Sequence, residues 1–277
     1  MSEGDMHWKT AITEIKPNEV RLRGYRVDEL MGRVTFAQAV YLALTGSLPS
    51  DRVAPLLDAI LVSSIDHGAT PPSTLAARTA ASTGAPLSAA VAAGILSINR
   101  HHGGAIEDCM RLILRIIAAA DGDAAKLEQV AETVVAEYRA RKERLPGLGH
   151  RLHSADPRTA RLFALAENAG VAAQGVLALR QVAAAVAQQT GRELPVNVDG
   201  AIAAILVDLG LAPELGNAFF IIARLPGLVA HSLEEQTRER PVRPIHPTDH
   251  SYDGPSARAF PPAEAKDKSS DQSRWEN

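Results

Sequence analysis

Cysteine and aromatic residues are scarce in this chain of 277 residues. The single cysteine, Cys109, excludes an intramolecular disulfide framework and is typical of a reducing compartment. Aromatic residues make up 4% of the chain and hydrophobic residues 46%, so Ala, Leu, Val and Ile must fill most of the core. Small side chains let helix axes approach each other closely, and this composition therefore favours packed helices.

Several classes of protein are disfavoured by what the sequence lacks. A net charge of −3, without a basic stripe interleaved with aromatics, argues against a nucleic-acid binder. The longest apolar run, residues 112–120, is broken by Arg115 and is too short to span a membrane, and residues 1–10 lack the apolar core of a signal peptide. Cys109 is not spaced with the histidines as a zinc site would require, so we expect no metal. We therefore expect a soluble, cytoplasmic protein with no nucleic-acid or membrane partner.

The hydrophobic pattern predicts a mostly α protein. β-Branched residues and the turn Pro17-Asn18 indicate irregular or extended structure over residues 1–34. Helical periodicity, caps and glycine stops predict helices at about residues 35–46, 51–65, 75–83, 87–98, 104–119, 123–141, 158–167, 175–189, 201–209 and 213–235. The last of these is nearly apolar, and we expect it to be buried for most of its length. Alternating Arg and Pro over residues 238–247 indicate an extended arm, and residues 263–277 are predicted to be disordered.

Four polar islands interrupt this apolar helical pattern. They are Asp66-His67-Gly68, residues 100–104, residues 146–158 and Asn197-Val198-Asp199-Gly200. Histidines and an aspartate beside glycines add nothing to the stability of a helical protein. A functional site is the usual reason when such residues interrupt an apolar helical pattern. Histidines, a carboxylate and nearby arginines are typical of an acid/base site for an anionic substrate.

The first two islands have structural alternatives. Asp66-His67-Gly68 fits a helix C-terminus capped by Gly68 about as well as it fits a substrate contact from His67. His102 precedes two glycines and the start of a helix, where the dipole disfavours the imidazolium and a neutral ring can donate to an enolate-like oxygen. We favour a function for His102 and a solvent-exposed turn for His101.

The third island is a glycine-punctuated loop followed by a helix start. Its backbone is open to a ligand, and a simple turn does not explain why His150 and Arg151 follow at once, so both become candidate site residues. Asp156 fits an N-cap, which would fix where Arg158 points. A guanidinium is suited to bidentate carboxylate binding, and Arg158 and Arg151 are candidates for that contact.

Asp199 and Arg224 complete the candidate set. For Asp199 an N-cap is the better interpretation of the sequence alone, and the competing role is a general base whose pKa is raised by an apolar surround. Arg224 lies in an apolar run and needs a partner, for which a bound anion is suitable. His231 has no flanking glycine and is interpreted as surface or structural.

In this order, the motifs resemble those of the citrate synthase superfamily. The resemblance covers roughly residues 17–255 and includes Arg23-Gly24-Tyr25, Tyr41-Leu42 and residues 45–49 in addition to the islands. It implies a citrate-synthase-like helical fold over residues 1–262, with a large subdomain and a small one at roughly residues 145–215. It also implies a homodimer or higher homo-oligomer.

The resemblance implies roles for individual residues. His102 is similar to the histidine that stabilises the acetyl-CoA enolate, His150 to the one that polarises the oxaloacetate carbonyl, and Asp199 to the base that takes the methyl proton. His67 is similar to the histidine that binds the oxaloacetate part of the substrate, and Arg158 and Arg224 to carboxylate-binding arginines. The loop that would cradle the adenine end of coenzyme A consists of Pro146, Gly147, Leu148 and Gly149.

Two departures from the synthase pattern bear on the activity. Gly68 stands where citrate synthases usually have Glu, and the chain has less N-terminal material than a typical synthase. Both features are similar to the compact citryl-CoA lyases and the module of ATP-citrate lyase, although that module carries an aromatic residue where His102 is retained here. The segment between His150 and Asp156 also differs, so no phosphate-binding residues are carried over to it.

The activity implied is the interconversion of citryl-CoA with acetyl-CoA and oxaloacetate, with a citryl-CoA lyase as the favoured form. A coenzyme A thioester is then a substrate, and no tightly bound cofactor is expected. The alternatives are a citrate synthase or methylcitrate-type synthase, which also hydrolyses the thioester, and a catalytically silent regulator that binds coenzyme A or citrate. A silent regulator has no need to keep His102, His150 and Asp199 together.

Overall fold

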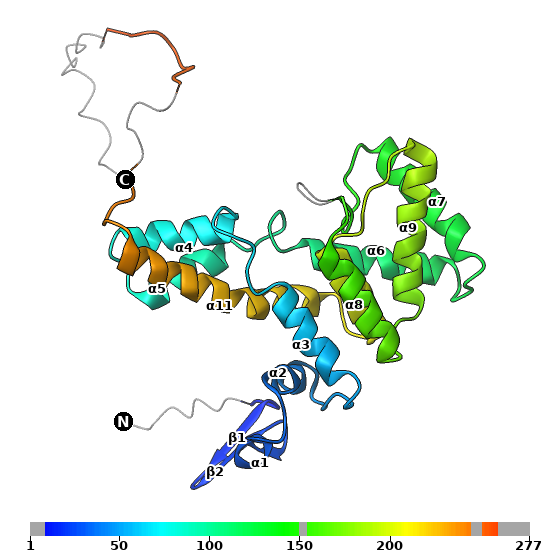
Figure 1. The fold of residues 1–277 in the computed structure, drawn as a ribbon, viewed down its shortest axis with the longest axis horizontal. Helices are drawn as coiled ribbons and strands as arrows, with labels where there is room; N and C mark the ends of the chain where they lie inside the picture. Colours follow the sequence, from blue (N-terminus) through cyan, green and yellow to red (C-terminus); the bar gives the residue numbers. More distant parts are fainter. Residues whose placement is uncertain (1–8, 150–153, 245–250, 260–277) are drawn as a thin grey trace, which may run out of the picture. The chain divides into compact units, whose positions relative to one another are not determined.

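The computed structural model describes residues 9–149, 154–244 and 251–259. These residues form a short N-terminal sheet followed by α-helices, so the predicted mostly α fold is confirmed (Figure 1). The residues up to Arg243 belong to one compact unit. The segment predicted to be disordered, residues 263–277, lies outside the described residues.

The sheet has three antiparallel strands in the order β1-β2-β3. They are β1 (Thr13–Lys16), β2 (Glu19–Leu22) and β3 (Tyr25–Arg26). Thr13 pairs with Leu22, and the turn between β1 and β2 falls at the predicted Pro17-Asn18. A single helical turn, α1 (Val27–Leu30), follows at once and was not predicted.

The remaining helices follow the predicted order, with ends that differ by a few residues. They are α2 (Phe36–Thr45), α3 (Ala54–Ser63), α4 (Pro72–Ser82), α5 (Leu87–Leu96), α6 (Ala105–Ala119), α7 (Leu127–Ala140), α8 (Pro157–Asn168), α9 (Gln174–Thr190), α10 (Val198–Asp208) and α11 (Glu214–Arg238). Local signals explain the best-predicted ends. Thr35 and Gln38 form a capping box before α2, and Gly46 ends that helix in a left-handed conformation with φ of 86°.

Helix α10 is the centre of the larger core. It contacts α6, α8, α9 and α11, and every residue from Ala201 to Leu206 is buried. Ala201, Ala203 and Ala204 have no bulk beyond Cβ, so the surrounding helices approach α10 closely. A helix buried on all sides needs no polar face, and this explains the absence of amphipathic spacing in its sequence.

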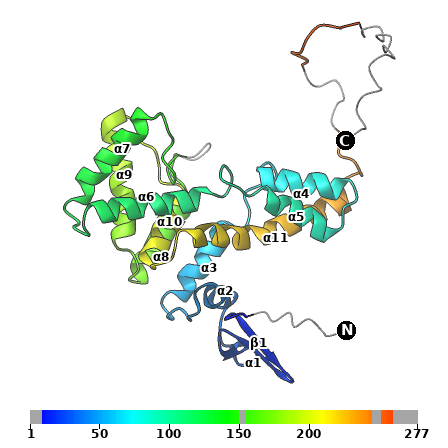
Figure 2. The ribbon, with the colours of Figure 1, turned by 180° about the vertical axis from the view of Figure 1, so that it is seen from behind.

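Helix α11 connects this core to the pair formed by α4 and α5 (Figure 2). The pair packs tightly around Gly94 of α5. A Cβ added there would lie 3.0 Å from Ser73 O and 3.1 Å from Leu228 Cδ1 of α11. The expected burial of α11 along most of its length holds for one face, on which buried residues recur from Gly216 to Glu235. The opposite face is open, because Leu225 and Leu233 are 39% and 44% exposed.

The predicted arm after α11 turns back onto the end of α4. Val242 N donates to Ser82 O at 2.7 Å. Arg243 pairs with Glu235, whose side chain is fully buried and also accepts from Arg78 Nε at 2.8 Å. The carboxylate between two arginines anchors the arm to α4 and α11.

The N-terminus of α9 is capped by a residue distant in sequence. Ala173 at the N-cap position has no side-chain hydrogen bond. Asp208, at the end of α10, accepts backbone N–H groups from Ala173, Gly175 and Val176 at 2.8, 2.6 and 3.1 Å. A carboxylate at a helix N-terminus also interacts favourably with the helix dipole. Asp208 therefore joins α9 to the central helix.

We expect Asp208→Ala to lower the free energy of unfolding by about 2–4 kcal/mol, because three N–H groups lose their acceptor. Urea unfolding followed by circular dichroism measures this change. The matched control is Asp123→Ala, which removes a carboxylate that accepts one exposed N–H, from Ala125. Its loss should be below about 1 kcal/mol. Equal losses in the two variants would contradict the capping role of Asp208.

Candidate active site

His102 is presented by a tight turn between α5 and α6. The turn is closed by paired backbone hydrogen bonds between Asn99 and His102, both 2.8 Å long. The ring lies against α4, where Nε2 is 2.8 Å from Ser73 Oγ, and against α11, where it meets the Phe220 ring edge-on at a centroid distance of 6.0 Å. Sequence patterns gave no indication of Ser73 or Phe220, because both belong to other helices.

The electrostatic surroundings keep His102 neutral. Burial is the main cause that lowers the pKa of His102, and the positive charges of Arg224 and His67 lower it further. The sequence predicted a neutral ring from the helix dipole at the start of α6, whereas here burial and the charges of Arg224 and His67 account for it. A neutral imidazole can donate one hydrogen bond and accept another at the same time.

Arg224 of α11 is a buried cation with unused hydrogen-bonding capacity. It is 3% exposed, its Nε donates to Ser64 O at 3.0 Å, and its Cζ lies 4.9 Å from the Phe220 ring centroid. Its Nη1 has no hydrogen-bond partner among the described residues. Burial lowers the pKa of Arg224, although the charges of Asp66 and Asp199 act in the opposite direction. An anion would satisfy this guanidinium, as the sequence suggested.

Asp156 and Arg158 form a locally determined pair at the start of α8. Asp156 caps the helix by accepting from Arg158 N at 3.0 Å, which confirms the predicted N-cap. The same carboxylate accepts from Arg158 Nε at 3.0 Å and Nη2 at 2.8 Å, and Nη1 donates to Ser63 O at 3.2 Å. A guanidinium has five N–H donors, so Arg158 keeps donors for a second anion while its position stays fixed.

Asp199 lies in the first turn of α10, and the favoured interpretation as an N-cap is wrong. The cap is Asn197, whose Oδ1 accepts from Gly200 N at 3.0 Å, so the helix begins three residues earlier than predicted. Burial raises the pKa of Asp199, and the opposing charges of Arg158 and Arg224 do not cancel this effect. The carboxylate is therefore more basic than usual, which is the property of a general base.

The loop of Pro146, Gly147, Leu148 and Gly149 is held beside the start of α10. Gly147 O accepts from Asn197 N at 3.1 Å, and Asn197 Nδ2 donates to Gly149 O at 2.9 Å. Gly147 has a φ of 80°, and a Cβ there would overlap Cys109 Sγ and Gly200 Cα. Glycine is thus required for the loop to approach α10. Cys109 is buried, as expected from its sequence context.

His67 lies in a loop and not at a helix end. Helix α3 ends at Ser63, so Gly68, with φ of 85°, does not cap it, and the structural alternative for this island is wrong. Asp66 accepts from Gly68 N at 2.9 Å and from the backbone N–H of His67. Its carboxylate therefore shapes the backbone on which His67 stands.

The candidate residues act on one another electrostatically although they come from separate elements. The charges of Arg224 and His67 both influence the pKa of His102. The charges of Arg224 and Arg158 both influence the pKa of Asp199. The structure thus brings together five of the predicted site residues. His150 and Arg151 lie outside the described residues. Among the residues that are described, no group of His, Cys, Asp or Glu is arranged to hold a metal ion.

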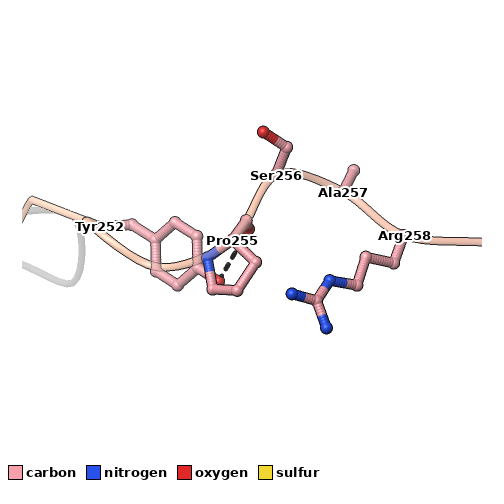
Figure 3. Close-up of a pocket in the computed structure, with 5 residues that line it drawn as sticks. All are labelled: Tyr252, Pro255, Ser256, Ala257 and Arg258. Atoms are coloured by element: carbon pink, nitrogen blue, oxygen red, sulfur yellow. Dashed lines mark hydrogen bonds between the residues drawn. The ribbon is translucent and has the colours of Figure 1, made fainter.

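Two cavities are found among the described residues. One, of about 680 Å³, lies between α8 and α9 and includes Asp156 and Thr159 in its lining. The other, of about 530 Å³, is formed within the separate stretch 251–259 by Tyr252, Pro255, Ser256, Ala257 and Arg258 (Figure 3). Neither is lined by His67, His102, Asp199 or Arg224. Within the described part of the chain, no helix has the length and apolarity needed to cross a membrane.

Comparison with known proteins places this arrangement in a family. The model of the citrate synthase C-terminal domain matches residues 48–245. A citryl-CoA lyase from Hydrogenobacter thermophilus is 43% identical, with a TM-score of 0.83 over 92% of this chain and 97% of that chain. An ATP citrate lyase from Methanothrix soehngenii, 24% identical, shares the fold with a TM-score of 0.75 over 91% of this chain and 43% of that chain.

Sequence relatives give the same result. Citrate synthase from Haloferax volcanii is 32% identical over 205 residues, which are 73% of this chain and 52% of that protein. The chain thus spans about half the length of the curated relatives that it matches. The family model covers more than half of the chain and includes every candidate site residue. The chain therefore belongs to the citrate synthase family.

Proposed function

We propose that the protein interconverts citryl-CoA with acetyl-CoA and oxaloacetate, and that it acts as a citryl-CoA lyase. The observation that carries this proposal is the position of Arg224, a buried cation with an unpaired Nη1 whose charge acts on a neutral His102 and on Asp199. Such a site suits a dicarboxylate next to an acid/base pair. The near full-length similarity to the H. thermophilus lyase supports the same activity.

In cleavage, His150 takes the proton of the tertiary hydroxyl of citryl-CoA. The carbon–carbon bond breaks, the hydroxyl carbon becomes the ketone of oxaloacetate, and the bonding electrons form the enolate of acetyl-CoA. Asp199 then gives its proton to the enolate carbon, which becomes the methyl group. Asp199 must start this step protonated, and burial raises its pKa in the required direction. In the reverse direction, Asp199 takes the methyl proton.

His102 stabilises the enolate by donating a hydrogen bond to its oxygen. The hydroxyl of Ser73 lies 2.8 Å from Nε2. We assign the hydroxyl as the donor to that nitrogen, which leaves the proton of the neutral ring on Nδ1. A neutral donor matched to an enolate oxygen stabilises charge that develops only in the transition state. This assignment makes Ser73 a positioning residue for the tautomer of His102.

The other candidates bind the substrates. His67, Arg158, Arg224 and Arg151 contact the carboxylates of oxaloacetate, and the loop at residues 146–149 contacts the adenine end of coenzyme A. The ATP citrate lyase from M. soehngenii, which has this fold, was solved with citrate and coenzyme A bound. We further propose that residues 145–215 form the small subdomain and that the protein is a cytoplasmic homodimer or higher homo-oligomer. Coenzyme A thioesters are substrates here, and no resident cofactor takes part.

A citrate synthase activity is the second candidate, because His102 is retained and the H. volcanii relative is a citrate synthase. Product analysis separates the two. With citryl-CoA as substrate, a lyase releases oxaloacetate and acetyl-CoA without free coenzyme A. With acetyl-CoA and oxaloacetate, a synthase releases citrate and free coenzyme A, which a thiol reagent detects. Appearance of that free thiol contradicts a lyase-only activity, and binding without turnover of any of these substrates indicates a silent regulator.

We expect Ser73→Ala to lower kcat about tenfold, because loss of this partly buried hydrogen bond lets the His102 ring adopt either tautomer. The KM for oxaloacetate should stay within about twofold, since Ser73 is not among the residues proposed to bind that substrate. Steady-state kinetics measure both constants. Ser73→Thr, which keeps the hydroxyl, should recover much of kcat. A variant that changed only KM would contradict the positioning role.

A further inference from the structure

Three residues on one face of α11 hold the segment that precedes His67. Arg224, Gly227 and His231 are spaced by three and four positions, so they line up along the helix. Each of them contacts one residue of the segment. Arg224 Nε donates to Ser64 O at 3.0 Å, and His231 Nε2 lies 3.0 Å from Asp66 Oδ1. Between them, Ile65 O occupies the space that a side chain at Gly227 would need. Residues 64, 65 and 66, which lead to His67, therefore each contact α11.

Asp66 connects these contacts with α11 to His67. Its carboxylate accepts from the backbone N–H groups of His67 and Gly68 and from the His231 ring. Partial burial raises the pKa of Asp66, but these hydrogen bonds and the charge of His231 outweigh it and lower the pKa overall. The carboxylate is ionised at neutral pH and can only accept, so Nε2 of His231 carries the proton.

Of the two interpretations that the sequence left open for His231, surface or structural, the structure favours the structural one. Its side chain is 16% exposed, and Nδ1 is buried without a hydrogen-bond partner among the described residues. The nearest acid to Nδ1 is Glu234 of the same helix, at 3.9 Å. The ring thus directs its one firm hydrogen bond at Asp66. No element of the proposed chemistry uses it directly.

We propose that His231 is a positioning residue that acts through Asp66 to place His67, and thereby sets the affinity of the site for a dicarboxylate. This inference rests on the proposed function only for the role of His67. The mechanical part, that the His231 hydrogen bond orders residues 64–68, stands on the contacts alone. Removing the ring would free the Asp66 carboxylate to turn to solvent and release the backbone of His67 and Gly68.

The experiment compares His231→Ala with His231→Gln, whose amide N–H can still donate to Asp66. Gln236→Ala is the matched control, because it removes another side-chain hydrogen bond of α11, the one to Ala85 O at 2.8 Å. Hydrogen–deuterium exchange of the peptide containing residues 64–71 reports the order of the segment. Steady-state kinetics report KM for oxaloacetate and kcat, and calorimetry reports citrate affinity.

We expect His231→Ala to speed exchange in residues 64–71 about tenfold and to raise KM for oxaloacetate about tenfold, with kcat within about threefold. His231→Gln should restore both values, and Gln236→Ala should change neither. The inference is overturned if exchange of the segment is unchanged in His231→Ala, or if kcat falls while KM stays constant. If the wild-type protein turns over none of the substrates, the proposed function fails separately, and the exchange experiment still decides whether His231 orders the segment.

Discussion

Replacing Asp199 by Asn is expected to lower turnover about a thousandfold, because an amide can neither take a proton from carbon nor return one. The side chain keeps its size, so the packing at the start of α10 and the adjacent loop at residues 146–149 should persist. Binding of citrate and of coenzyme A should therefore stay within a few-fold of the wild type. Single-turnover kinetics and calorimetry measure the two effects separately. Turnover that survived the change would exclude Asp199 as the base.

The same variant is expected to be more stable than the wild type at neutral pH. Burial raises the pKa of Asp199 above its ordinary value of 3.8, so the folded state favours the protonated carboxyl. The stability that this proton contributes is present below the unfolded pKa. It is lost as pH rises through the folded pKa, and at pH 7 the buried charge is destabilising. Asn carries no such charge.

Thermal unfolding at several pH values tests whether the Asp199→Asn variant is more or less stable than the wild type. The Tm of Asp199→Asn should exceed that of the wild type at pH 7, and the difference should shrink as pH falls towards 4. Asp51→Asn, at an exposed position, is the control and should alter neither Tm nor turnover. A lower Tm for Asp199→Asn at pH 7 would show that its attraction to Arg158 and Arg224 outweighs the burial.

Replacing Arg224 by Met is expected to weaken citrate binding about a hundredfold or more. The guanidinium is buried and has an unpaired Nη1, so the variant loses a desolvated charge contact with the bound anion. Met fills a similar volume without a charge. The free energy of unfolding should fall by no more than about 1 kcal/mol, because removing the cost of burying the cation offsets the lost hydrogen bond to Ser64.

The variant also tests the coupling between the groups of the site. Without the positive charge of Arg224, the lowered pKa of His102 should move back towards its ordinary value of 6.5. An NMR titration of the His102 ring protons measures this shift. Arg180→Met, which breaks an exposed pair with Glu167, is the control and should leave both citrate affinity and the His102 pKa unchanged. Unchanged citrate affinity in Arg224→Met would remove the main support for the anion site.

Local chemistry made much of the fold predictable. Thr35, Gly46 and Asp156 act within a few residues of their own positions, and the helix ends they control were predicted correctly. The start of α10 was placed too late, because both Asn197 and Asp199 can cap a helix and the choice depends on the adjacent loop at residues 146–149. The one-turn helix α1 was missed, since a single turn has no periodicity to detect.

The sequence by itself determined the helices and the chemical identity of the reactive groups, because capping, hydrophobic spacing and glycine loops are read within a few residues. Only the tertiary structure decided how those groups behave. The pKa directions of His102 and Asp199 depend on burial and on charges from other helices. The contact of Arg224 with Ser64 joins residues 160 positions apart. Such distances carry no local signal, so the environment of each site residue follows from packing alone.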